Sequence, residues 1–238
     1  ERKNILKKCE AVFCVSNYIK NQFLDGISSK NKKVHVLYNG VDRKIKNFPI
    51  KKKEVLFVGR IVPDKGVHLY VEVIKLIASN YPDWSFGLIG SYKLGENNIT
   101  DDYADNVISE FKEIGNQAKF FGFKDQNFVQ KKMKTASIII IPSLWQEPFG
   151  LVASEAMSNG ISIIASKVGG IPEIVKRNGI LIKNINVKKI ETRLIELINN
   201  QKLRKSYQKK AWENFRLSSL NSSQKLDKHR KFIIQNYY

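Results

Sequence analysis

Short apolar runs alternate with amphipathic stretches along most of the chain, and this alternation predicts its fold. The runs are rich in Val, Ile and Phe, as is typical of buried strands, and the stretches between them repeat apolar side chains at helical spacing. Such runs occupy residues 54–58, 84–89, 118–121, 137–141, 161–164 and 179–182. The alternation predicts an α/β fold with a parallel, doubly wound, Rossmann-like sheet, whose ligands bind beyond the carboxyl ends of the strands.

A smaller unit precedes this alternating region. Residues 11–15 and 34–37 are short apolar runs, and Ser16 is suited to cap a helix that continues to Phe23. Two strands with one helix between them cannot form an independent sheet domain, so we interpret this segment as the last βαβ unit of a larger domain. We therefore expect an N-terminal portion beyond Glu1 that this chain lacks.

The Lys-rich stretch 43–53 separates the two regions, and its like charges predict a solvated, extended linker. Further along, Asp101 and Asp102 are suited to cap a helix. Beyond Val187 the pattern is helical, and these last helices are expected to pack outside the sheet. The predicted domains are 1–48 for the end of the N-terminal domain with the linker, 49–200 for the Rossmann-like domain, and 201–238 for the C-terminal helices.

The chain is strongly basic, since 41 Lys and Arg against 22 Asp and Glu give a formal net charge of +19. A basic surface favours an anionic membrane or a nucleic acid as partner. No zinc-finger spacing, aromatic RNA-binding motif or helix-turn-helix signature indicates nucleic-acid recognition. We therefore expect no nucleic-acid partner, and the anionic membrane surface is the candidate that the charge suggests.

Cysteine usage and hydropathy bear on the compartment. Cys9 and Cys14 have no further cysteine to pair with, which indicates neither a disulfide framework nor a zinc site and fits a reducing compartment. No apolar run approaches the length of a membrane span, and no signal peptide is recognisable. We expect a cytoplasmic protein that binds peripherally to the inner face of the cell membrane. His35, His68 and His229 have no metal spacing and are interpreted as structural or solvent-facing.

Candidate chemistry is concentrated after the apolar run at 137–141. Pro148 disfavours a helical residue before it, so Glu147 is placed in a loop, whereas residues 151–158 are predicted to form a short helix with Glu155 one turn inside it. Gly150 at the helix start lets a ligand approach free N–H groups, which suits a phosphate. Two carboxylates beside an anion site suit a ligand with hydroxyls and phosphates, such as a sugar nucleotide. The alternative interpretation is a solvated loop glutamate and a helix-surface glutamate.

Two cations lie at the end of the first strand of the alternating region. Gly59 and Arg60 follow that strand directly, and Lys65 with Gly66 leads into the next helix. Arg can bind phosphate oxygens bidentately and Lys is a compact positive charge, so together they could neutralise a diphosphate leaving group. Ordinary surface cations are the alternative.

These strings resemble those of a known family. The stretch from Glu147 to Glu155, with seven residues between them and Pro-Phe-Gly after the first, resembles the signature of the family 4 (group 1) retaining glycosyltransferases, which have the GT-B fold. Gly-Arg-x4-Lys-Gly at 59–66 is similar to the donor-phosphate motif of that family, and Asn-Gly-Val-Asp at 39–42 to its junction between domains. The resemblance covers residues 12 to about 200.

The resemblance implies an activity. It is the transfer of a hexosyl or N-acetylhexosaminyl group from a nucleotide-diphosphate sugar, with a UDP-sugar favoured, to a glycan or lipid-linked acceptor. The family carries out this transfer with retention of the anomeric configuration and without a bound metal. The expected pathway is polysaccharide or lipopolysaccharide biosynthesis. The acceptor-side Gly-rich loop and the histidine of the N-terminal domain are missing from this chain. We therefore expect that the isolated chain binds the donor without transferring its sugar.

The resemblance also assigns roles to individual residues. Arg60 and Lys65 would hold the diphosphate, Glu155 the ribose and Glu147 the sugar hydroxyls, and Glu147, Arg60 and Lys65 are the predicted catalytic residues. Gly90 and Phe123 would lie near the nucleotide and its base. The predicted donor-binding set is Gly59, Arg60, Lys65, Gly90, Phe123, Glu147, Phe149, Gly150, Leu151 and Glu155. Weaker candidates are Gly122, Gly169, Gly170 and Glu173, and Trp145 is interpreted as a core aromatic.

Other functions remain as alternatives. Within the same fold these are a nucleotide-sugar 2-epimerase and a phosphorylase. Outside the enzymes, the alternative is a basic module that binds nucleic acid or a membrane.

Overall fold

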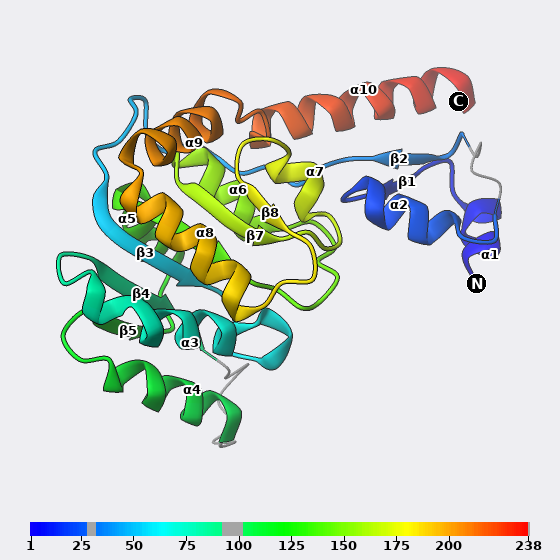
Figure 1. Cartoon of the computed structure of the whole chain (residues 1–238). Helices are drawn as coiled ribbons and strands as arrows, with labels where there is room; N and C mark the ends of the chain where they lie inside the picture. The colour runs from blue at the N-terminus through cyan, green and yellow to red at the C-terminus, as the bar shows by residue number, and fades with distance from the viewer. Residues whose placement is uncertain (28–31, 92–101, 238) are drawn as a thin grey trace.

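The computed structural model of the chain describes residues 1–27, 32–91 and 102–237, and it shows a large α/β domain with a small N-terminal unit beside it (Figure 1). Asp101, the first of the two predicted capping residues, lies outside these ranges. The helix that it would precede is present as α4 (Asp102–Glu113).

The large domain is built on a sheet of six parallel strands in the order β5-β4-β3-β6-β7-β8. The strands are β3 (Lys52–Val58), β4 (Ser85–Ile89), β5 (Ala118–Gly122), β6 (Ala136–Ile141), β7 (Ser162–Ser166) and β8 (Ile180–Ile182). The predicted parallel, doubly wound sheet is therefore confirmed. Strand order reverses between β3 and β6, and a crevice opens at the carboxyl ends of strands where this happens.

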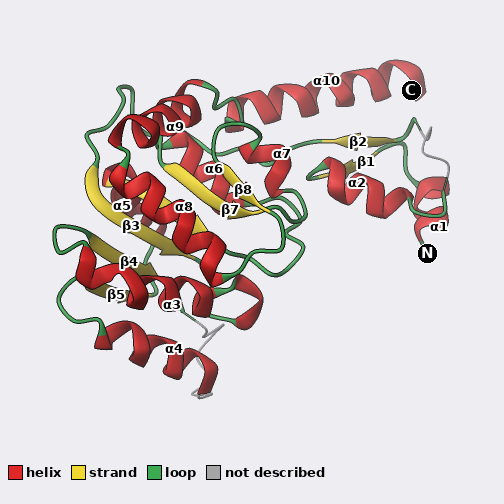
Figure 2. Cartoon of the chain, in the orientation of Figure 1, coloured by secondary structure: helices red, strands yellow, loops and turns green. Residues whose placement is uncertain are grey.

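Helices cover both faces of this sheet, as Figure 2 shows. Successive strand residues point to opposite faces, so Ile138 and Ile140 of β6 join one core cluster and Ile139 joins the other. The first cluster is covered by α3 (Val67–Ile77), α4 and α8 (Val187–Asn199), and the second by α5 (Gln126–Thr135), α6 (Leu151–Ser158), α7 (Ile171–Val175) and α9 (Gln201–Glu213). Two short 3-10 helices, η1 (Pro63–Lys65) and η2 (Ala78–Asn80), flank α3.

The N-terminal unit has the predicted strand-helix-strand order. It consists of α1 (Arg2–Lys8), β1 (Val12–Cys14), α2 (Asn17–Leu24) and β2 (Val34–Val36), and β1 pairs with β2 in parallel. Ser16 caps α2 as predicted, since its hydroxyl accepts a hydrogen bond from the Ile19 N–H.

The last helix, α10 (Ser219–Tyr237), connects the two parts. Figure 1 shows it leaving the large domain near α9 and running along the N-terminal unit. The Ser222 hydroxyl donates to the Tyr38 carbonyl at 2.9 Å, and the His229 ring lies 4.3 Å from that of His35. These two histidines therefore have a structural role, as predicted.

The prediction of a solvated linker at 43–53 holds for Lys44 and Lys46, which are exposed, and is wrong for Arg43 and Lys51. The Arg43 guanidinium lies 3.7 Å from the centre of the Trp212 ring and donates to the Ser158 carbonyl. Lys51 donates to the carbonyls of Met133, Lys134 and Asn159 at 2.7 to 3.3 Å, and burial lowers its pKa to about 7. Long basic side chains can satisfy carbonyls at helix ends and bury their stems, so a run of like charges need not be solvated.

Candidate functional site

A hollow of about 150 Å³ lies at the switch point of the sheet, beyond the carboxyl ends of β3 and β6. Its lining is Phe57, Val58, Gly59, Lys65, Ile141, Ser143, Glu147, Gly150, Leu151, Val152, Ala153 and Ile171. The loop that carries Lys65 and the loop that carries Glu147, which the sequence singled out, therefore meet here. We call this the Glu147 hollow.

An ion pair between Lys65 and Glu147 stands in the wall of this hollow. The Ser143 hydroxyl donates to the same Glu147 oxygen at 2.9 Å. Only 22% of the Lys65 side chain and 14% of the Glu147 side chain are exposed. Because the pair is largely shielded from water, the two charges interact more strongly than an exposed pair would.

The backbone holds these two loops together. The Leu144 and Trp145 N–H groups both donate to the Asp64 carbonyl, at 2.8 and 3.1 Å. Gly66 has a left-handed φ of 65°, and any Cβ there would collide with the carbonyl of Pro142. The glycine before α3 is therefore needed for the close approach of the two loops, which places Lys65 against Glu147.

The start of α6 opens into the same hollow. Gly150 is its N-cap, no side chain caps it, and Leu151, Val152 and Ala153 of its first turn all line the hollow. The first N–H groups of a helix lack partners within the helix and concentrate positive potential. Phe149 is buried just before this turn, with its ring 6.2 Å from that of Tyr38. The arrangement is suited to an anion beside Lys65.

A second hollow of about 200 Å³ adjoins the first and shares Val58 and Gly59 with it. We call it the Phe123 hollow. Exposed Arg60 lines it together with Gly90 and Phe123, whose side chain is 78% exposed. Gly90 belongs there for a steric reason, because a Cβ at this position would collide with the Gly59 carbonyl.

Glu155 is buried, with 7% exposure, and accepts a hydrogen bond of 2.6 Å from the Gln126 amide. Burial raises the pKa of its carboxyl, and the hydrogen bond from Gln126 opposes that effect. The alternative of a helix-surface glutamate is therefore wrong. The predicted contact with a ribose stays a prediction.

Two further sequence candidates support the loop that carries Glu147. The Gly170 N–H donates to the Glu147 carbonyl at 2.7 Å, and the Gly169 N–H donates to the Gln146 side chain at 2.8 Å. Glu173 accepts hydrogen bonds from the N-terminal unit. Gly122 ends β5 and lines neither hollow.

Trp145 was expected in the core, and this prediction is wrong, because 51% of the residue is exposed. Its backbone N–H, rather than its ring, is what anchors the loop. Sequence reasoning also missed Ser143 and Gln126, whose side chains bind the two glutamates. Neither has a local signal, because the spacing of the glutamates does not reveal their partners.

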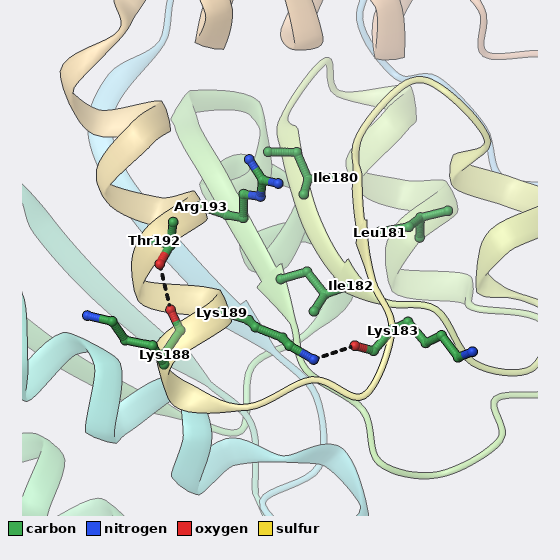
Figure 3. Close-up of a pocket in the computed structure, with 8 residues that line it drawn as sticks. All are labelled: Ile180, Leu181, Ile182, Lys183, Lys188, Lys189, Thr192 and Arg193. Carbon is green, nitrogen blue, oxygen red and sulfur yellow. Dashed lines mark hydrogen bonds between the residues drawn. The ribbon is translucent and has the colours of Figure 1, made fainter.

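A third hollow, of about 440 Å³, lies between β8 and α8 and is more basic (Figure 3). Three of its four cations, all on α8, are occupied within the protein. Lys189 donates to the carbonyls of Lys183 and Asn184, Lys188 pairs with Glu191, and Arg193 pairs with Glu196. None of the predicted site residues lines it. We therefore take the Glu147 and Phe123 hollows as the candidate site.

Within the described ranges, no group of three or more His, Cys, Asp or Glu side chains is arranged to hold a metal ion. Across those same ranges, no helix has both the length and the apolar character to cross a membrane.

Comparison with known proteins identifies the family. Residues 40–213 match the family described as Glycosyl transferases group 1, and the chain belongs to it. An uncharacterized glycosyltransferase of Methanocaldococcus jannaschii, MJ1178, is 36% identical over 199 residues, which are 83% of this chain and 52% of that protein. The lipopolysaccharide 1,2-N-acetylglucosaminetransferase of Salmonella typhimurium is 31% identical over 121 residues, which are 51% of this chain and 32% of that protein.

Solved structures agree on the fold. Anabaena Alr3699/HepE in complex with UDP matches with a TM-score of 0.80 and 22% identity, over 94% of this chain and 64% of that one. The predicted family and the GT-B type of fold are thus confirmed. The chain spans about half the length of MJ1178.

Proposed function

We propose that this chain is the donor-binding part of a glycosyltransferase that moves a hexosyl or N-acetylhexosaminyl group from a nucleotide-diphosphate sugar to a glycan or lipid-linked acceptor, with retention. One observation carries the proposal: Lys65, Glu147 and the uncapped start of α6 converge in one hollow at the switch point of the sheet. Cations and N–H groups suit a diphosphate, and a carboxylate suits sugar hydroxyls.

The diphosphate would lie against the start of α6. Lys65 stands in that hollow, and Arg60 can reach the bound group from the adjoining one. As the bond between sugar and phosphate breaks, negative charge develops on the departing nucleotide. Arg60, Lys65 and the helix start would stabilise that charge, which is the main contribution expected of a preorganised site. The mechanism that we propose uses no metal.

The Lys65–Glu147 pair suggests how the site would recognise its donor. In the structure each charge is the partner of the other. An entering donor would offer phosphate to Lys65 and hydroxyls to Glu147, so that neither charge is left buried and unpaired. This exchange favours ligands that carry both groups over a bare phosphate or a bare sugar.

The nucleoside would occupy the Phe123 hollow. Phe123 presents an exposed aromatic ring beside Gly90, where a base could stack. Glu155 would bind the ribose with the carboxylate oxygen that Gln126 does not engage. Each hollow is smaller than the range of about 300–1,000 Å³ that is usual for ligand sites, so the donor would span both.

Relatives support the proposed donor and pathway. The HepE structures contain UDP and UDP-glucose, and the Salmonella relative is named as a lipopolysaccharide N-acetylglucosaminetransferase. They support a UDP-sugar and a role in polysaccharide or lipopolysaccharide assembly. A screen of nucleotide sugars and acceptors with the complete protein tests the proposal. Release of a free 2-epimerised sugar, without transfer, would instead establish the epimerase alternative.

We also propose a membrane partner, because an amphipathic groove lies at the other end of the sheet. It has a volume of about 710 Å³ between the segment before β3 and α9, and we call it the linker groove. Ile50 is 91% exposed there, Phe48 is 44% exposed, and Lys205 and Lys209 stand opposite. Apolar side chains rimmed by lysines suit the interface of an anionic bilayer. The protein would then be cytoplasmic and peripheral on the inner face of the cell membrane.

A further inference from the structure

We propose that Glu173 is a positioning residue, which joins the N-terminal unit to the large domain and thereby fixes the loop that carries Glu147. Its carboxylate accepts four hydrogen bonds from the N-terminal unit, all of 2.7 to 2.9 Å. The donors are the backbone N–H groups of Asn17 and Tyr18, the Asn17 side-chain amide and the Tyr38 hydroxyl. Every one of these donors is more than 130 residues away in the sequence.

The first of these contacts complete the start of α2. Asn17 and Tyr18 are its first two residues, and their N–H groups have no acceptor within the helix. The Ser16 hydroxyl accepts from the third N–H group, that of Ile19. Glu173 supplies the acceptors for the other two, and its negative charge suits the positive end of the helix. The cap of α2 is therefore shared between two distant parts of the chain.

The same carboxylate is anchored behind the site loop. Glu173 lies on α7, directly after the turn at Gly169 and Gly170. The Gly170 N–H donates to the Glu147 carbonyl at 2.7 Å, and a Cβ at either glycine would collide with the backbone of residues 147–149. The turn and the site loop are thus packed against each other without room for a side chain. A movement of α7 would displace the backbone of Glu147.

A second hydrogen bond joins the N-terminal unit directly to the loop that carries Glu147. The Ser16 hydroxyl, at the cap of α2, donates to the Pro148 carbonyl at 2.5 Å. The loop residue next to Glu147 is therefore held by the N-terminal unit directly, as well as through Glu173. The Glu147 loop is thus bonded to the turn before α7, and Glu173 of α7 is bonded to the start of α2. Ser16, at the cap of α2, is bonded back to the same loop at Pro148. The position of the Glu147 backbone is consequently coupled to the docking of the N-terminal unit against the large domain.

Residue-resolved amide exchange on this chain tests the coupling. In Glu173→Gln, one oxygen becomes an NH₂ group that faces other donors, so we expect the Asn17 and Tyr18 amides to exchange about ten to a hundred times faster. Coupling further predicts several-fold faster exchange at Gly170, whose N–H is bonded to Glu147. The matched control is Glu191→Gln on α8, where the carboxylate pairs with nearby Lys188. It should change neither region.

Faster exchange at Asn17 and Tyr18 with no change at Gly170 would overturn the proposal, because Glu173 would then be a local cap. Unchanged exchange at Asn17 and Tyr18 would overturn it as well. Ser16→Ala removes the hydrogen bond to the Pro148 carbonyl and should also accelerate exchange at Gly170. A thermal melt of each variant checks that it is folded. The coupling itself does not depend on the proposed function; only the assignment of Glu147 to donor binding does. If the unmodified chain binds no UDP, that function fails while the exchange result still decides the coupling.

Discussion

The two ends of the central sheet carry positive charge in different ways. At the carboxyl end, Lys65 is held against Glu147 by backbone contacts between two loops, beside a helix start. At the amino end, Lys205 and Lys209 are exposed around the apolar side chains of the linker groove. The first arrangement fits a small ligand of defined shape, and the second fits an extended anionic surface. The difference teaches that charge alone does not locate a binding site, whereas convergent geometry does.

The largest effect expected is the complete absence of sugar transfer by the isolated chain. Binding donor and acceptor together contributes about 7–11 kcal/mol to such a reaction, and this chain spans about half of the relative MJ1178. We expect UDP binding without transfer in a radiolabelled-donor assay over candidate acceptors. Sustained transfer by the purified chain would contradict the assignment of this chain to donor binding alone.

The two glutamates of the carboxyl end should differ in their effects. Glu155→Gln should weaken binding of UDP about ten- to a hundredfold, because it removes a charge-assisted hydrogen bond to the ribose. Glu147→Gln should leave UDP binding nearly intact and impair use of the sugar nucleotide by the complete enzyme. Calorimetry with bare UDP distinguishes them, and similar losses for both variants would show that the division of roles is wrong.

The amino end should respond to salt and to its own lysines. Each lysine near an anionic membrane contributes about 1 kcal/mol, so Lys205→Ala should weaken binding to anionic vesicles about fivefold. Binding should fall with added salt, which screens charges beyond about 8 Å at physiological ionic strength, and neutral vesicles should bind poorly. Lys188→Ala, at the hollow between β8 and α8, is the matched control. Equal effects of both substitutions would locate the contact elsewhere.

The effect of anionic vesicles on UDP affinity tests whether the two ends of the sheet bind separate ligands. The linker groove precedes β3, whereas the Glu147 hollow follows it. We therefore expect saturating anionic vesicles to leave UDP affinity unchanged. Competition between vesicles and UDP would place both ligands at one end of the sheet.

A smaller effect is expected from pH at the seam between the N-terminal unit and the large domain. Burial opposes the charge on Glu173, but hydrogen bonds from Asn17, Tyr18 and Tyr38 outweigh it and lower the pKa of this carboxyl from its ordinary 4.5. A lowered pKa in the folded state stabilises the seam above the ordinary value, and this stability is lost as pH falls through the lowered value. Tyr38, whose pKa burial and Glu173 raise to about 12, stays neutral throughout.

Exchange at the Tyr18 amide, corrected for the intrinsic effect of pH, should therefore rise below about pH 4.5. Glu173→Gln should abolish this dependence, since an amide does not titrate. The same pH response in that variant would assign the effect to another group.

Local patterns were enough to predict much of this fold. Strand positions follow from apolar runs, and the cap at Ser16 follows from its side chain and is confirmed by the hydrogen bond that the Ile19 N–H donates to it. The helix predicted at 151–158 is confirmed as α6. Such features depend on neighbours within one or two turns, so the sequence alone contains them.

The partners of charged groups could not be predicted in this way. Lys65 and Glu147 are 82 residues apart, and each was assigned to a ligand rather than to the other. Lys51 was expected in solvent, yet its ammonium group donates to two carbonyls of α5 and one at the end of α6. Trp145 has the large aromatic side chain of a typical core residue, but the hydrogen bonds from its loop backbone to the Asp64 carbonyl determine its position. These outcomes depend on how the loops meet in three dimensions.

Titration calorimetry with UDP and with uridine tests the central claim most directly. The unmodified chain should bind UDP, and Lys65→Ala and Arg60→Ala should each lose about ten- to a hundredfold in UDP affinity, with far smaller losses for uridine. Lys189→Ala, in the more basic hollow beside β8, is the control and should bind UDP normally. Equal losses for UDP and uridine, or a loss in Lys189→Ala as large as in Lys65→Ala, would contradict a diphosphate site at the Glu147 hollow.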